Sequence, residues 1–311
     1  MLAFFVAFLW YSYSMISTKI DKKITIGIVA PSRPIIGIEN EIKDGIDLLI
    51  ANGFNVKIGK NVRKKSYYMA GTPEERVSDI HDAFSDDEID IVIAATGGSC
   101  SNQILNLIDY RLISKHKKTF IGYSDITNLL FALHVKSNLK TVHGPDIRAL
   151  SKLDEKSLEI YVKMLKNEPY SEPIKESGMT IIKPGTFKGK IIGGNITLIN
   201  GLLATPFCPD YQDSILFWEE IGEGPAMIDF KLNELKLSGV FDKISGMIIG
   251  HLDGCEDLKH PEDNRSIDDI VLETVKEYNF PIAKANWFGH ALSCFYPLEI
   301  NADIAEYLSQ K

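Results

Sequence analysis

The chain from Ile24 to about Pro145 alternates short apolar runs with longer segments in which apolar residues recur at helical spacing. The apolar runs are Ile24–Ala30, Phe54–Ile58, Ile89–Ala95, Lys118–Ser124 and Lys140–Pro145. Continuous apolar runs bounded by turn residues are typical of strands that are buried on both faces. This alternation predicts an α/β unit, in which helices cover both faces of a parallel sheet.

Explicit start signals support the helix predicted from Ala70 to Phe84. Thr72 is a favourable N-cap, Pro73 occupies the first helical position, and Glu75 completes a capping box. Helical spacing also predicts a helix over residues 103–110 and another over residues 125–138.

The chain length and a change in the sequence pattern indicate two domains. With 311 residues, the chain exceeds what one hydrophobic core usually supports. Residues 20–150 carry the strand–helix alternation, and residues 151–185 are richer in Lys, Glu and Pro and form a connecting region. Residues 186–311 are glycine-punctuated, with isolated apolar strands, and we expect a second, β-rich domain there.

The first fourteen residues, 1–14, are treated apart from the fold. Their apolar run from Leu2 to Trp10 is too short to span a bilayer, so no stable membrane span is expected. A signal-like reading lacks the Lys or Arg that normally precedes the apolar region. We favour a non-native start, with Met15 as the true first residue.

Composition restricts the class of partner. Hydrophobic residues make up 45% and charged residues 24%, as in an ordinary soluble globular protein. The net charge of −8 and the lack of a Lys/Arg-rich stripe argue against nucleic acid and favour a small molecule. Four scattered cysteines without a CxxC pair indicate neither a disulfide framework nor a structural zinc site, and they fit a cytoplasmic protein.

Candidate chemistry gathers at three predicted strand ends, where ligands bind in open α/β sheets. These ends are Pro31-Ser32, residues 96–99 and Tyr123-Ser124-Asp125. Ser124 stands between a strand and a helix, as a nucleophile does at an elbow, but GYSDI is not the G-x-S-x-G of hydrolases. Local sequence alone favours the alternative, a serine that caps the helix.

A nucleophilic serine would need a base and an acid that orients it. His143, His251 and His290 each stand beside a glycine at a strand end, and the local pattern does not choose among them. Strand alternation allows only one of Glu219 and Glu220 to share a face with Phe217, and a buried carboxylate there needs a partner.

The glycine pair Gly97-Gly98 follows a buried strand, so its backbone N–H groups could reach a ligand unobstructed. Such a pair could stabilise an oxyanion or cradle a phosphate, and the two readings stay open at this point.

Seven motifs occur in an order that resembles the LD-carboxypeptidase family of serine peptidases, which includes the microcin C immunity proteins. They are IGIVAPS, AGTPEERVSDIHDAFSDDEIDIVIAATGG, SNQILNLIDY, GYSDIT, GKIIGGNITLINGLLATP, LFWEEIGE and FGH, spread over residues 24–298. The resemblance implies a Rossmann-like parallel-sheet N-terminal domain, a β-rich C-terminal domain, no metal, no cofactor and a homodimer.

The same resemblance implies residue roles. Ser124 is the expected nucleophile, His290 the base and Glu219 the acid of a Ser-His-Glu triad. The expected oxyanion hole is formed by the backbone N–H groups of Gly98, Gly97 and Asp125. Ser99 lies in the expected substrate cleft, and for Asn195 two readings stay open, lining this cleft or holding a turn. The implied reaction removes a terminal D-amino acid from a murein-type peptide through an acyl-enzyme. The alternative substrate is a peptidyl- or aminoacyl-nucleotide conjugate, as in the immunity branch.

Two positions depart from the family pattern and leave specificity open. Ser99-Cys100 replaces an aromatic residue that often follows the glycine pair, and Ala291 replaces a glycine after the histidine. Other hypotheses are weaker: a phosphate-binding enzyme lacks suitable acids near residues 96–101, and a non-catalytic binding protein would lack a triad member. Cys100 and Cys294 do not stand at an elbow, and His251 with Cys255 is too small a set for a metal site.

Overall fold

The computed structural model describes residues 23–169, 178–256, 260, 262 and 265–308, so the segment 1–14 lies outside it. Its first sheet has six strands in the order β11-β5-β4-β3-β1-β2. Their bounds are β1 (Thr25–Val29), β2 (Asn55–Ile58), β3 (Ile91–Ala94), β4 (Thr119–Gly122), β5 (Thr141–His143) and β11 (Leu298–Glu299). All neighbours pair in parallel except β11 with β5, which confirms the predicted parallel sheet.

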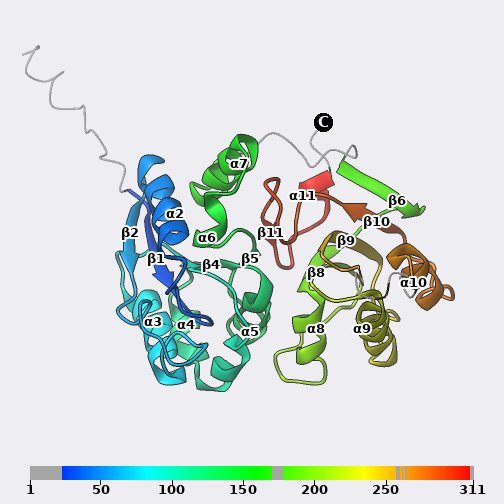
Figure 1. The fold of residues 1–311 in the computed structure, drawn as a ribbon, viewed down its shortest axis with the longest axis horizontal. Coiled ribbons are helices and arrows are strands. Elements are labelled where there is room, and N and C mark those ends of the chain that lie inside the picture. Colours follow the sequence, from blue (N-terminus) through cyan, green and yellow to red (C-terminus); the bar gives the residue numbers. More distant parts are fainter. Residues whose placement is uncertain (1–22, 170–177, 257–259, 261, 263–264, 309–311) are drawn as a thin grey trace, which may run out of the picture.

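Helices cover both faces of this sheet (Figure 1). The helices on one face are α2 (Glu39–Ala51), α6 (Ile147–Leu150) and α7 (Glu155–Leu165), and those on the other are α3 (Pro73–Ser85), α4 (Tyr110–Lys115) and α5 (Thr127–Ser137). Each face buries its own apolar cluster, because alternate residues of β1 point to opposite sides: Ile28 belongs to one cluster and Val29 to the other.

The capping signals work as predicted at α3 and differ at the next helix. Thr72 accepts the Glu75 N–H, and the Glu75 carboxylate accepts the Thr72 N–H, so the capping box is confirmed. The helix predicted over residues 103–110 is instead a 3₁₀ helix, η1 (Ser101–Leu107), followed by α4. The Asp109 carboxylate accepts two N–H groups of α4 and thereby starts a new helix rather than continuing the first.

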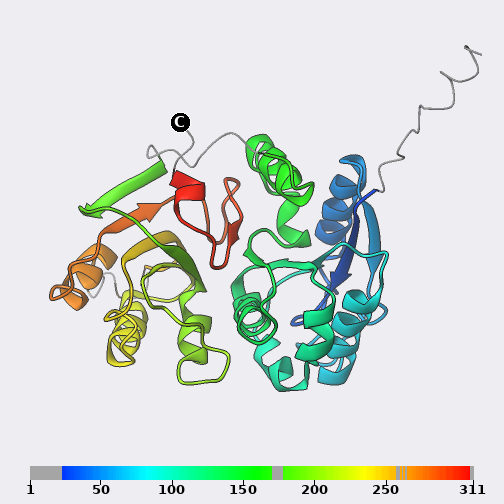
Figure 2. The same ribbon diagram turned by 180° about the vertical axis from the view of Figure 1, so that it is seen from behind.

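The second sheet has five strands in the order β6-β10-β9-β8-β7. Its strands are β6 (Met179–Lys183), β7 (Lys190–Asn195), β8 (Ser214–Ile221), β9 (Gly246–Asp253) and β10 (Ile282–Ala285), and its helices are α8 (Ile196–Leu202), α9 (Pro225–Leu237), α10 (Ile267–Thr274) and α11 (Ala305–Leu308). Only β6 runs antiparallel to its neighbour. Figure 2 shows β11 returning from this half of the chain to the edge of the first sheet.

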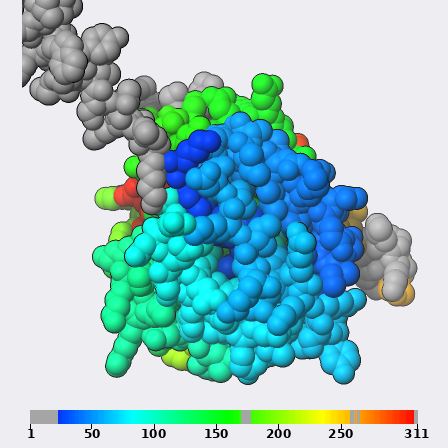
Figure 3. Space-filling model, turned by 90° about the vertical axis from the view of Figure 1, so that its left-hand side faces the viewer, coloured from blue at the N-terminus to red at the C-terminus, as the bar shows by residue number. Residues whose placement is uncertain are grey.

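One apolar cluster joins the two halves. It contains Phe120 and Phe131 of the first sheet and its helix α5, together with Ile191 and Trp218 of the second sheet. Helix α5 contacts both α8 and β7, so it lies at the junction of the halves. The opposite end of the molecule, formed by α2, α3 and their loops, faces the viewer in Figure 3. Within the described ranges, no helix is both long and apolar enough to cross a membrane.

The tight packing of β7 against β8 generates a stability prediction. A Cβ atom on Gly193 would lie 1.7 Å from the Phe217 carbonyl oxygen, whereas a Cβ atom on Gly201, in α8, meets nothing within 4 Å. We expect Gly193→Ala to destabilise the protein by about 3 kcal/mol, because backbone would have to move. The matched control Gly201→Ala should stabilise it by about 0.5 kcal/mol. Urea unfolding monitored by circular dichroism measures both, and equal midpoints for the two variants would contradict the prediction.

Candidate active site

Ser124 stands at a strained turn between β4 and the 3₁₀ helix η2 (Ser124–Ile126). Its φ of 60° lies in the left-handed region, which is unfavourable for a residue with a side chain. The Ser124 hydroxyl caps neither η2 nor α5, so the capping alternative raised by the local sequence is not what the structure contains. Strain without a capping bond is typical of a serine presented to a ligand.

The glycine pair lies directly against this turn. A Cβ atom on Gly97 would be 3.1 Å from the Ser124 Cβ and 3.3 Å from its Oγ. A Cβ atom on Gly98 would be 2.2 Å from the Ser32 Oγ and 2.8 Å from the Arg33 backbone nitrogen, so a side chain does not fit at Gly98. Gly98 and Ser99 are exposed, whereas Gly97 is buried. The loop therefore brings bare backbone beside the serine at the edge of the sheet where ligands bind.

The Asp125 carboxylate ties together three of the strand ends. Its Oδ2 accepts hydrogen bonds from the Ser32 hydroxyl at 2.5 Å, the Cys100 N–H at 3.0 Å and the Ser101 N–H at 2.9 Å. The Asp125 carbonyl accepts the Ser101 hydroxyl at 2.7 Å. The side chain of Asp125 is thus committed to holding the loops after β1 and β3, and it is buried.

Glu219 and His290 form a close pair. Glu219 Oε2 lies 2.6 Å from His290 Nδ1, and the Glu219 side chain is fully buried. Glu219 stands at a register shift in the pairing of β8 with β9. Because Nδ1 binds the carboxylate and carries the proton, Nε2 remains as the acceptor nitrogen of the ring.

The environment of His290 favours its protonated form. Burial by itself lowers the pKa of His290, but the hydrogen bond and charge of Glu219 outweigh it, together with the charges of Glu220 and Asp146, and the pKa is raised. The imidazolium that would form on proton transfer is therefore stabilised by these carboxylates.

The turn that carries His290 is held by a backbone hydrogen bond to β9. Gly289 has a φ of 128° and Ala291 a φ of 56°, so both neighbours of the histidine lie in the left-handed region. The His251 N–H donates to the Phe288 carbonyl at 2.9 Å and anchors this turn to β9. At Ala291, a residue with a side chain, this conformation costs about 1 kcal/mol.

The structure distinguishes the three histidines that the local pattern left open. The His290 ring lies 5.0 Å, centroid to centroid, from the ring of Tyr123, the residue before Ser124. His143 is wholly buried among aromatic rings, and neither ring nitrogen has a hydrogen-bond partner among the described residues. Burial, with the charge of His290, lowers the pKa of His143 to about 3, so this ring stays neutral. His251 contributes through its backbone.

Asn195 is buried beneath the pair rather than exposed in a cleft. It lies opposite Glu219 in the pairing of β7 with β8, and its Nδ2 donates to Glu220 Oε1 at 2.8 Å. Its backbone N–H donates to the Thr127 hydroxyl at 3.2 Å, three residues after Ser124. Asn195 therefore connects the strand of the two glutamates to the helix that follows the serine.

One residue near the site was not predicted from the sequence. Asp146 is 2% exposed, and its carboxylate accepts the Gly97 N–H at 3.1 Å and the Ala149 N–H at 3.0 Å. Its position just after the strand end at His143-Gly144-Pro145 resembles that of the other candidates, and this was the signal that could have indicated it.

The thiols and metal-ligand residues suggest no second centre. Cys100 is buried, with its Sγ 3.5 Å from both the Ser32 Oγ and the Arg76 Nη1, and all four cysteines are free. In the part of the chain that the structure describes, no group of three or more His, Cys, Asp or Glu side chains could hold a metal ion.

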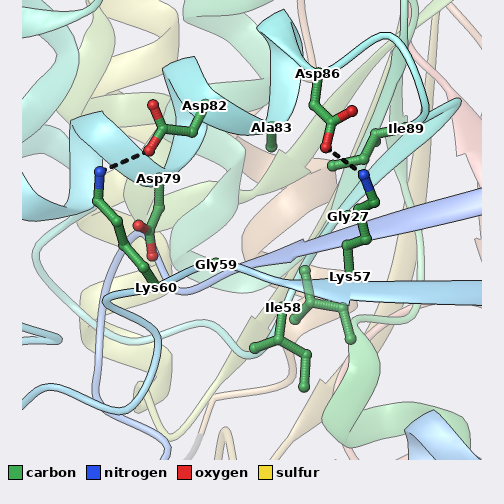
Figure 4. A pocket seen from close by; sticks show the side chains of 11 residues that line it. Gly27, Lys57, Ile58, Gly59, Lys60, Asp79, Asp82, Ala83, Asp86 and Ile89 are labelled. Carbon is green, nitrogen blue, oxygen red and sulfur yellow. Dashed lines mark hydrogen bonds and ion pairs between the residues drawn. The ribbon is translucent and has the colours of Figure 1, made fainter.

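A pocket between β1, β2 and α3 contains none of the predicted site residues (Figure 4). Its charged side chains are already paired: Lys57 with Asp86 at 2.6 Å and Lys60 with Asp82 at 2.7 Å. Asp79 accepts the backbone N–H of Asn61 at 2.9 Å. Both lysines are thus ion-paired, and the carboxylate of Asp79 is hydrogen-bonded within the protein.

Comparison with known families agrees with this geometry. The N-terminal domain model of LD-carboxypeptidases matches residues 26–144, and the C-terminal domain model matches residues 188–304. The chain belongs to the LD-carboxypeptidase family. It is accordingly an enzyme of the carboxypeptidase class, as the sequence motifs predicted.

Relatives of this chain fall into both branches expected from the motifs. A probable murein peptide carboxypeptidase of Bacillus subtilis (strain 168) is 32% identical over 274 residues, covering 87% of this chain and 85% of the relative. The microcin C7 self-immunity protein MccF of Escherichia coli is 29% identical over 257 residues, covering 73% and 75%. The structure of MccF with glutamyl sulfamoyl guanosine superposes with a TM-score of 0.81 at 22% identity, covering 91% of this chain and 92% of that one, which confirms the two-domain fold.

The Glu219–His290 pair of this LD-carboxypeptidase yields a prediction about protonation. Replacing Glu219 with Gln removes the charge that raises the pKa of His290 and leaves burial, which lowers it. We expect the pKa of His290 to lie above 6.5 in the natural protein and to fall in Glu219→Gln, as followed by NMR titration of the imidazole signals. The control is Glu88→Gln, which removes an exposed carboxylate that is paired with Lys57 and not with His290. An unchanged pKa in Glu219→Gln would show that the pair does not set the protonation of His290.

Proposed function

We propose that this protein is a serine peptidase that hydrolyses the amide bond to a terminal D-amino acid in murein-type peptides. The nucleophile comes from the domain of residues 20–150, and the acid and base come from the domain of residues 186–311. The observation that carries the proposal is the 2.6 Å contact of Glu219 with His290, beside a serine turn that is strained and caps nothing. The relative with 32% identity, named for murein peptides, supports this substrate class.

The reaction would proceed through an acyl-enzyme. His290 Nε2 takes the proton of the Ser124 hydroxyl while Oγ attacks the carbonyl carbon of the scissile amide. The imidazolium then gives this proton to the nitrogen of the leaving D-amino acid as the C–N bond breaks. His290 Nε2 then takes a proton from a water molecule, which attacks the ester carbonyl. The ester bond breaks, and the imidazolium returns the proton to the Ser124 oxygen. Glu219 holds the ring in the required tautomer and stabilises its positive charge.

The negative oxygen of the tetrahedral intermediate needs N–H donors. We assign this role to the backbone N–H groups of Gly98 and Asp125. The Gly97 N–H already donates to Asp146, so it is not assigned to the oxyanion. The role of Gly97 is to leave the space beside Ser124 free of a side chain. Ser99, exposed beside Gly98, is proposed to contact substrate. Asn195 is proposed to hold the strand of Glu219 and Glu220 in place through its hydrogen bond to Glu220.

A second substrate class is a peptidyl- or aminoacyl-nucleotide conjugate. The observation in its favour is the similarity to MccF, whose structure is known with glutamyl sulfamoyl guanosine. The same Ser124, His290 and Glu219 would cleave the amide in such a conjugate. The higher identity and wider coverage of the murein-type relative lead us to place this class second.

We further propose that the enzyme acts in the cytoplasm, in peptidoglycan recycling, as a homodimer without a cofactor or metal. Its four free cysteines are consistent with a reducing compartment. Light scattering of the purified chain tests the dimer.

Product analysis by mass spectrometry tests the reaction. The full chain and its Ser124→Ala variant would be incubated separately with a murein tetrapeptide and with a peptidyl-sulfamoyl-adenosine. We expect loss of the terminal D-alanine from the tetrapeptide, and a rate at least about 10⁴-fold lower in Ser124→Ala, because the nucleophile is removed.

The control is Ser85→Ala, at the exposed end of α3, which should retain the full rate. Cleavage of the nucleotide conjugate alone would assign the enzyme to the second substrate class. Cleavage that persists in Ser124→Ala would refute the assignment of Ser124 as nucleophile.

A further inference from the structure

Asp146 connects two loops at the carboxyl ends of β3 and β5. One carboxylate oxygen accepts the N–H of Gly97, at 3.1 Å, and the other accepts the N–H of Ala149, at 3.0 Å. The first bond reaches the glycine loop, and the second caps helix α6. A residue that only capped α6 would need the second bond alone.

The surroundings of Asp146 are rigid. The Arg148 N–H donates to the Ala95 carbonyl at 3.1 Å, and the Tyr161 hydroxyl donates to the Pro145 carbonyl at 2.8 Å. Helix α2 packs so closely on α6 that a Cβ atom on Gly45 would lie 2.0 Å from the Ile147 carbonyl oxygen. The segment that carries Asp146 is therefore held by its neighbours. Its carboxylate can in turn restrain the Gly97 peptide.

The restrained peptide adjoins the nucleophile. Two consecutive glycines sample more backbone conformations than any other pair, so a loop of Gly97 and Gly98 needs an external anchor to hold one of them. Gly97 lies against Ser124, and a Cβ atom on it would be 3.3 Å from the Ser124 Oγ. An error in the orientation of this peptide would move the next N–H, that of Gly98, relative to the reacting carbonyl.

We propose that Asp146 is a positioning residue for the oxyanion hole, which holds the Gly97 N–H so that the Gly98 N–H faces the developing oxyanion. The inference rests on the proposed hydrolysis by Ser124. Donors that are fixed before the reaction stabilise the transition state without reorganisation, and they do so most strongly away from water. The role of Asp146 is therefore expected in kcat rather than in substrate binding.

The ionisation of Asp146 determines how strongly it accepts the Gly97 N–H. Burial raises the pKa of Asp146 to about 7, against the lowering effects of the Ala149 and Gly97 N–H groups and of Arg148 and His290. Burial raises the pKa of Tyr123 and of Tyr161, and the negative charge of Asp146 adds to this effect. The same charge adds to that of Glu219 in raising the pKa of His290 against burial. Ionisation strengthens the bond from Gly97, because hydrogen bonds to charged acceptors are about twice as strong.

The variant Asp146→Ser separates positioning from capping. Serine caps a helix about as well as aspartate, but its single short hydroxyl cannot also reach Gly97. We expect kcat to fall by about 10-fold or more in this variant, with KM little changed, since removing an oxyanion donor outright costs about 10²–10³ in kcat. The matched control is Asp154→Ser. Asp154 also caps a helix, α7, through a 2.7 Å bond from the Ser157 N–H, and this bond does not involve Gly97.

Hydrogen exchange of the peptide covering residues 95–100 gives a readout that does not depend on activity. Exchange should be at least about ten-fold faster in Asp146→Ser than in the natural protein, and unchanged in Asp154→Ser. Unchanged exchange and unchanged kcat in Asp146→Ser would reduce Asp146 to a helix cap and overturn the inference.

If Asp146→Ser does not fold, Asp146→Thr replaces it. Threonine fills more of the volume of the carboxylate and also caps helices, but its one hydroxyl is as short as that of serine and cannot also reach Gly97, so exchange and kcat must change if the inference holds. If neither the natural protein nor Ser124→Ala cleaves either substrate, the proposed function is refuted. The exchange result would still decide the role of Asp146.

Discussion

The contact of helix α5 with strand β7 is the constraint on which the active site depends. Thr127 lies so close to Gly194 that a Cβ atom on this glycine would be 2.6 Å from the threonine hydroxyl, which also accepts the Asn195 N–H. Asn195 lies opposite Glu219 in the second sheet, and Glu219 holds His290. The Thr127 hydroxyl and the pairing of β7 with β8 thus connect the turn of Ser124 to the Glu219–His290 pair. The apolar cluster that spans both sheets keeps this contact closed, because separating the halves would expose it to water.

A second constraint is the burial of several carboxylates around one histidine. Buried charge is costly unless it is paired or hydrogen-bonded. Glu219 is paired with His290, Glu220 accepts from Asn195 and Thr197, and Asp146 accepts from two backbone N–H groups. Together these acids make the interior near His290 favourable for positive charge, and the neutral ring of His143 adds none that would oppose it. Two of the non-glycine residues with a left-handed φ, Ser124 and Ala291, lie in the same region.

Much of the fold could be predicted because its signals are local. The alternation of apolar runs predicted the parallel sheet, and the capping box at Thr72 and Glu75 predicted the start of α3. The break between η1 and α4 was missed, although Asp109, which causes it, is a good N-cap in the sequence. The return of β11 to the first sheet was also missed, because pairing between strands so far apart leaves no pattern in the two residues of β11.

For the site, the sequence by itself indicated which strand ends carry candidate residues. It also predicted that Ser124 stands at a strand-to-helix turn and, through ordered motifs, the family to which the chain belongs. It did not distinguish His143, His251 and His290 by local pattern, and it gave no role to Asp146 or Thr127. Only the tertiary structure decided that His290 meets Glu219, that His143 is sealed among aromatic rings, and that Asp146 holds Gly97. The physical reason is that periodicity and capping act over a few residues, whereas hydrogen bonds between side chains depend on how the two sheets pack around α5.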